Sequence, residues 1–187
     1  MTEGVLGCTF ETWSPGIGDP GPRGWITVAA YLAAAVLALR AGRGEAAARV
    51  RLFWFALGAG LLLLAVNKQL DLQSALTAAG RCAAKAGGWY DHRAGVQRAF
   101  VGTVGLSAVI AAAALATFMR RHLCRLWPAI LGACALLAFV AIRAAGFHHV
   151  DRLIGQGAFG VTVNLALELG GLALIAWGAA RAGGGAR

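Results

Sequence analysis

The chain has 187 residues, of which 59% are hydrophobic and 13% are charged, and its formal net charge is +9. Soluble domains average about 25% charged residues, so this composition excludes an ordinary soluble domain and is typical of a membrane protein. The positive charge does not indicate nucleic-acid binding, because the arginines flank apolar runs and no basic groove with interleaved aromatic residues is present. The length fits one membrane domain, residues 1–187.

Residues 1–24 are expected to lie outside the cytoplasm as a Pro/Gly-rich segment. They lack the basic region and apolar core of a signal peptide, so the first span is expected to act as its own insertion signal. Residues 14–24 hold three of the four prolines, a density typical of a turn-rich loop.

Five apolar stretches follow, and they predict an all-α fold, a bundle of five transmembrane helices. The predicted spans are residues 25–41, 52–70, 99–119, 126–147 and 158–180. Residues 71–98 form an outer loop. It contains a helical pattern that either prolongs the second helix or lies in the membrane interface.

The basic residues predict the orientation of the bundle. The loops after the first and third spans and the tail are short and hold most arginines, so the positive-inside rule places the N-terminus outside and the C-terminus inside. Of the four cysteines, Cys8 and Cys82 then share the outer side, where a disulfide between them is one possibility.

A polar run follows the second apolar stretch. Residues 52–66 cover only about 22 Å of a hydrocarbon core of about 30 Å. The next residues therefore lie near or inside the membrane boundary, and the polar ones are Asn67, Lys68, Gln69, Asp71 and Gln73. Ionisable groups at that depth are costly and usually face the bundle interior, which makes this run a candidate functional site. The alternative is that Asn67 and Lys68 only end the span and reach the interface.

Further polar residues fall at the same predicted membrane face. They precede the third span, follow the fourth and enter the fifth: Asp91, His92 and Arg93; His148, His149 and Asp151; Asn164 and Glu168. Asn164 and Glu168 share one helical face with Gly171, a small residue that allows a neighbouring helix to approach closely. Arg143 lies deeper in the membrane than His148. We expect it to form a buried ion pair with Glu168. This pair either only stabilises helix packing or belongs to the functional site.

The adjacent histidines are the most chemically suggestive element. Imidazole is the commonest metal ligand, and Asp151 supplies a further ligand or orients a histidine. With His92, the pair His148-His149 predicts a site for a divalent transition metal such as zinc. The alternatives are interface histidines that titrate or donate hydrogen bonds, and a bis-histidine haem. No recognised metal motif is present.

Three functional hypotheses follow. The first is a metal-dependent membrane hydrolase, in which a metal-activated water attacks a lipid-linked or periplasmic substrate and Asp71 or Glu168 acts catalytically. The second is a non-catalytic accessory or assembly subunit of a larger membrane complex, which packs against membrane proteins or a second copy of itself. The third is haem binding or translocation of protons or a solute; the apolar inner halves of the spans count against translocation. All three have the lipid bilayer as a partner and none involves nucleic acid.

Four stretches also carry a resemblance. They are residues 13–20 (WSPGIGDP), 24–31 (GWITVAAY), 67–73 (NKQLDLQ) and 147–151 (FHHVD). Together they resemble a group of small uncharacterised bacterial membrane proteins. The resemblance implies a multi-pass protein of the bacterial inner (plasma) membrane and implies no activity.

Overall fold

The computed structural model describes residues 2–14, 16–17, 20–70, 72–90, 93–144 and 158–184, and within them it contains helices and turns but no strand. The helices are α1 (Thr2–Thr12), α2 (Pro22–Arg43), α3 (Ala48–Leu70), α4 (Leu72–Ala86), α5 (Arg93–Phe118), the 3-10 turn η2 (Arg120–His122), α6 (Leu123–Ala144) and α8 (Ala158–Gly184). Five of the helices in this part of the chain, α2, α3, α5, α6 and α8, are long and apolar enough to cross a membrane. The all-α class is therefore confirmed, with five helices that could cross a membrane, and the exact bounds of the spans and the orientation of the termini stay predictions.

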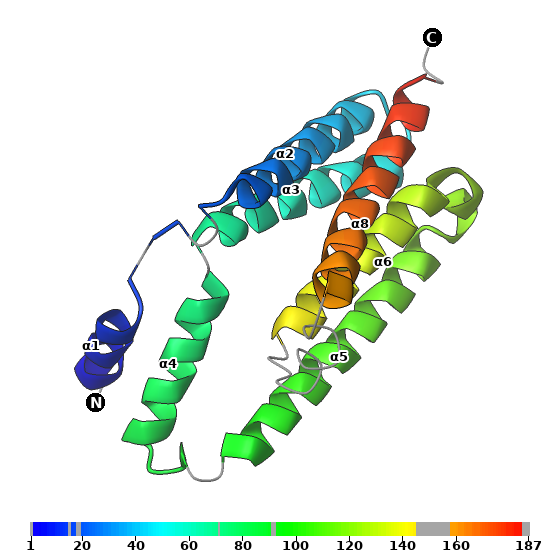
Figure 1. Ribbon diagram of the computed structural model, residues 1–187. Coiled ribbons are helices and arrows are strands. Elements are labelled where there is room, and N and C mark those ends of the chain that lie inside the picture. Colours follow the sequence, from blue (N-terminus) through cyan, green and yellow to red (C-terminus); the bar gives the residue numbers. More distant parts are fainter. Residues whose placement is uncertain are drawn as a thin grey trace.

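Consecutive long helices run in opposite directions, so the bundle has two ends (Figure 1). At one end α2, α5 and α8 begin and α3 and α6 finish; we name it the α4 end, because α4 continues from α3 there. The other end carries η2, and we name it the η2 end. The predicted topology places the α4 end outside the cytoplasm.

Four of the long helices pack together. The α2 helix lies against both α3 and α8, and α8 lies against α6 (Figure 1). Small residues on the packed faces allow this close approach. A Cβ atom added at Gly132 of α6 would lie 2.5 Å from the carbonyl oxygen of Gly171 on α8, so Gly132 has no room for a side chain, and a Cβ atom at Gly171 would lie a tight 3.1 Å from the carbonyl oxygen of Gly132. This contact agrees with the close approach expected at Gly171.

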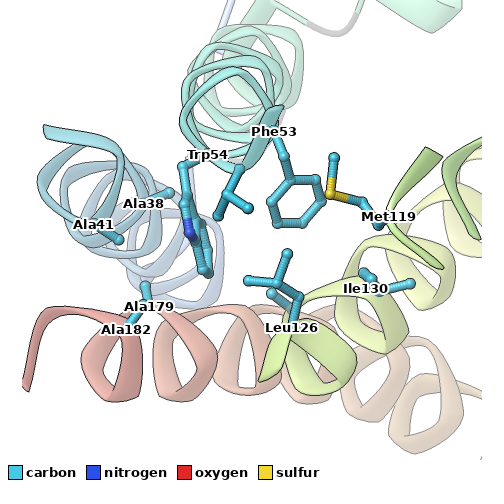
Figure 2. Close-up of a cluster of buried hydrophobic side chains, with 11 residues drawn as sticks. Ala38, Ala41, Phe53, Trp54, Met119, Leu126, Ile130, Ala179 and Ala182 are labelled. Atoms are coloured by element: carbon cyan, nitrogen blue, oxygen red, sulfur yellow. The ribbon is translucent and has the colours of Figure 1, made fainter. Parts of the chain in front are cut away.

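Larger side chains fill the η2 end of the bundle. The indole of Trp54, on α3, is fully buried. Figure 2 shows it between alanines of α2 and α8, with Phe53 and Leu126 beside it. The small alanine side chains leave space for the indole, so this one side chain of α3 packs against both α2 and α8.

The α1 and α4 helices form a separate pair beyond the α4 end of the bundle (Figure 1). A disulfide joins Cys8 of α1 to Cys82 of α4, with 6.0 Å between their Cα atoms. The pairing that the sequence left open is therefore confirmed. The α4 helix also confirms the helical pattern after the second span, whereas α1 was not predicted. Its first two turns contain Gly4 and Gly7, which weaken the helical signal.

Candidate functional site

Glu168 is the centre of a buried polar cluster. Only 4% of this residue is exposed, and it lies in the apolar α8 helix. The Lys68 Nζ atom lies 3.2 Å from its Oε1 atom and 3.1 Å from its Oε2 atom. The Tyr31 hydroxyl donates a second hydrogen bond to Oε1, at 3.1 Å. We name Tyr31, Lys68 and Glu168 the Lys–Glu–Tyr cluster.

Helix direction explains why the three side chains meet. Tyr31 lies nine residues after the start of α2 and Glu168 ten residues after the start of α8, which is about 14–15 Å from the α4 end in each case. Lys68 lies only two residues before the end of α3. Side chains lean toward the N-terminus of their own helix. Tyr31 and Glu168 therefore lean toward the α4 end, while Lys68 leans into the bundle from it.

The position of Lys68 follows from the buried face of α3. Leu61 and Ala65 are buried, and Lys68 and Gln69 come three and four residues after Ala65, so both continue this face. Leu70 is exposed and marks the other side of the helix. The alternative reading, in which Lys68 only reaches out to the interface, does not fit the contact that the structure shows with Glu168.

Gln69 adds an unsatisfied amide to the same turn of α3. Its Nε2 and Oε1 atoms are both buried and have no hydrogen-bond partner among the described residues. A glutamine amide offers two donors and one acceptor, and a buried polar atom without a partner costs about 1–3 kcal/mol. The amide is therefore the part of this face with unused hydrogen-bonding capacity.

The electrostatics of the cluster follow from its burial. The Lys68 side chain is 17% exposed and that of Glu168 is 5% exposed. A carboxylate in such surroundings is stable only when its charge is paired and its oxygens are hydrogen-bonded. Lys68 and Tyr31 provide both. The cluster is neutral as a unit and ties α3 to α8 across α2.

The predicted partner of Glu168 was Arg143, and the partner that the structure describes is Lys68. The Arg143 side chain lies outside the described residues, so the pair Arg143–Glu168 stays a prediction. The α6 helix reaches Ala144, which places residue 143 at the α4 end. Asn164 belongs to α8 and Gln73 to α4, but their side chains are likewise outside the description. Asn67 is half-buried on α3.

The predicted metal ligands cannot be placed in the same way. His92, His148, His149 and Asp151 lie outside the described residues, as do Asp71 and Asp91, and so does the side chain of Arg93. Within the described part of the chain, no group of three His, Cys, Asp or Glu residues could hold a metal ion. A metal site would therefore depend on the predicted ligands, and it stays a prediction.

Tyr31 is a site residue that sequence reasoning missed. It is 2% exposed and belongs to the buried face of α2, with Ala34, Ala35 and Ala38. A tyrosine near the end of an apolar stretch is typical of the membrane interface, and its hydroxyl carries no separate signal. The signal that was available is its register with the small residues of α2, which places it on the packed face.

A second ion pair at the η2 end was also not predicted. Glu45, in the loop between α2 and α3, pairs with Arg125 in the first turn of α6. Glu45 is the only acid in its loop, and Arg125 was expected on the same membrane side. Those two facts would have sufficed to suggest the pair.

Comparison with known proteins does not extend this description. No protein-family model, no curated protein and no solved structure matches the chain. The fold and the site define a multi-pass membrane protein with a buried charged cluster near one end of its bundle.

Proposed function

We propose that this chain is a multi-pass protein of the bacterial inner membrane that binds a polar ligand at the α4 end of its bundle. The Lys–Glu–Tyr cluster forms the rigid bottom of the site, and Gln69 faces the ligand. The observation that carries the proposal is the Gln69 amide, whose two polar atoms are buried without a partner among the described residues beside a fully paired cluster. A ligand that hydrogen-bonds this amide would remove the cost of burying it.

The reaction we propose for the site is metal-dependent hydrolysis of a lipid-linked or periplasmic substrate. His148, His149, Asp151 and His92 are the proposed ligands of a divalent metal such as zinc, and a metal of this kind supplies an activated water. The contacts of Glu168 refine its role. Lys68 contacts both of its oxygens and Tyr31 contacts one, so we assign this paired carboxylate a positioning role and take Asp71 as the candidate for the general base.

The metal part of the proposal is tested by elemental analysis and an absorption spectrum of the purified full chain. We expect about one metal per chain, lost in His148→Ala and His149→Ala. His122→Ala is the matched control, because η2 lies at the opposite end of the bundle. A haem band would replace the hydrolase with an electron carrier. Absence of both metal and chromophore in protein supplied with zinc would refute the metal chemistry.

The ligand part is tested separately with Gln69→Leu. If the amide serves a ligand, the variant keeps or gains thermal stability without ligand, because an unsatisfied buried group is removed. It also loses small molecules or lipids that mass spectrometry finds retained by the wild-type chain. A clear loss of stability would show instead that Gln69 has a structural partner, and the proposed site would fail.

The α5 helix favours a second candidate function, that of a subunit in a membrane assembly. None of its described side chains is buried, and Leu106, Val109 and Ile110 are each at least 59% exposed. Small residues recur every fourth position on its exposed surface: Gly95, Ala99, Thr103, Ser107 and Ala111. Such a face suits close contact with another helix. Ser107→Leu would abolish copurification of a partner or a second copy, while Ser107→Ala, which keeps a small residue at this position, would leave it unchanged.

A further inference from the structure

The pair of helices outside the bundle encloses a hollow of about 260 Å³. Its α4 wall is a single helical stripe, with Ser74, Thr77, Arg81 and Lys85 at intervals of three to four residues. Its α1 wall carries Thr12 and Trp13, and the Cys8–Cys82 disulfide closes one side. The volume is just under the range of about 300–1,000 Å³ typical of pockets for small molecules.

The chemistry of the lining is one-sided. Arg81 and Lys85 contribute two positive charges, Thr12, Ser74 and Thr77 carry hydroxyl groups, and no acidic residue is among the described residues that line the hollow. Glu11, next to Thr12 on α1, is exposed and is not part of the lining. Guanidinium and ammonium groups are the side chains that recognise phosphate oxygens, whereas the Thr12 hydroxyl already donates to the carbonyl oxygen of Cys8.

The surroundings of the hollow are typical of the membrane interface. The α1–α4 pair exposes large apolar side chains beside its basic stripe: Leu6 at 59%, Phe10 at 63% and Leu76 at 62%. Apolar groups next to lysine and arginine are typical of helices that lie in a membrane interface. Because α4 follows α3 after one residue, the end of the hollow at Ser74 lies close to the end of a candidate membrane span.

We propose that this hollow binds a phosphate group, with Arg81 and Lys85 as its cationic ligands and the disulfide as the device that holds its two walls together. The group belongs to an anionic lipid headgroup or to a free phosphate compound. The site is distinct from the Lys–Glu–Tyr cluster and does not depend on the function proposed for it.

The test uses the full chain in nanodiscs and in detergent. Native mass spectrometry would count phosphatidylglycerol retained against phosphatidylcholine, and isothermal titration would measure inorganic phosphate. We expect each cation to contribute about three- to fivefold in affinity at low salt, so Arg81→Gln weakens binding by that factor and Arg81→Gln/Lys85→Gln by about tenfold or more. Phosphatidylglycerol preference without phosphate binding identifies the lipid as the source. Binding of inorganic phosphate identifies the free compound.

Two control variants keep the proposal falsifiable. Arg23→Gln removes an exposed charge at the same end of the bundle but outside the lining, and we expect it to bind as the wild type does. Equal losses in Arg23→Gln and Arg81→Gln would mean a diffuse charge effect and would overturn the site. Cys8→Ser/Cys82→Ser keeps both cations but removes the covalent link between α1 and α4. We expect it to lose as much affinity for the phosphate probe as Arg81→Gln/Lys85→Gln does. Unchanged binding in Arg81→Gln/Lys85→Gln, or no preference for either phosphate probe over phosphatidylcholine, would also overturn it.

Discussion

The two ends of the bundle each hold a buried carboxylate paired with a basic side chain, and the two pairs differ in their surroundings. Glu168 lies within α8, ten residues after the helix begins, and its partner Lys68 is 17% exposed. Glu45 lies in a loop, and its partner Arg125 is 51% exposed. A carboxylate within a helix cannot turn away when its partner is lost, whereas one in a loop can move into water. The same pairing is therefore expected to matter far more at the α4 end than at the η2 end.

The largest expected effect comes from removing the base at the α4 end. Lys68→Met leaves the Glu168 carboxylate buried without its counter-charge, and such a loss costs about 3–5 kcal/mol of unfolding free energy. Thermal or SDS unfolding in detergent, followed by circular dichroism, measures it. The variant Lys68→Met/Glu168→Met removes both charges and is expected to recover most of the stability. A double variant as unstable as the single one would show that the two residues act separately.

The Tyr31 hydroxyl ranks next. Tyr31→Phe keeps the buried ring and removes only the donor to Glu168 Oε1, so we expect a loss of about 1.5–3 kcal/mol, the range for a hydrogen bond to a charged group. The same unfolding measurement applies. In the Lys68→Met/Glu168→Met background the hydroxyl has lost this acceptor, and the cost should shrink. An equal cost in both backgrounds would mean that Tyr31 does not act through Glu168.

At the η2 end the matching substitution is expected to cost much less. Arg125→Gln removes the partner of Glu45, but the loop can bring that carboxylate to water, so the loss should stay at about 0.5–1 kcal/mol. Unfolding of this variant beside Lys68→Met compares the two ends directly. A loss as large as that of Lys68→Met would show that burial alone, and not attachment to a helix, sets the cost.

The contrast between the ends also marks the limit of prediction from sequence. Lys68 and Glu168 stand out because charged residues at the end of or inside apolar runs are rare, so their membership in a polar site was predictable. Their pairing was not. Depth along each helix is readable from the chain, but the order in which helices pack is not, and α2 lies between α3 and α8 only in the folded bundle.

Other features could be predicted where they depend on local sequence, and could not where they depend on residues far apart in the chain. The five long helices follow from apolar length, a local property of the chain. The α1 helix did not follow, because Gly4 and Gly7 weaken its local helical signal and its place beside α4 depends on a disulfide to a residue 74 positions away. Tyr31 was missed for a related reason, since only a neighbouring carboxylate distinguishes its hydroxyl from that of an interface tyrosine.

Salt provides the smallest and most selective test of the comparison. Raising the salt concentration from 0.1 M to 1 M shortens the screening length from about 10 Å to about 3 Å, which acts on charges in contact with water. The coupling energy of Arg125 and Glu45, measured by a double-mutant cycle with Arg125→Gln and Glu45→Gln, should fall by a few tenths of a kcal/mol. The coupling of Lys68 and Glu168 should not change, because little water reaches either side chain. If both couplings fell together, ions would reach the Lys–Glu–Tyr cluster, and its description as a buried base for the ligand site would be wrong.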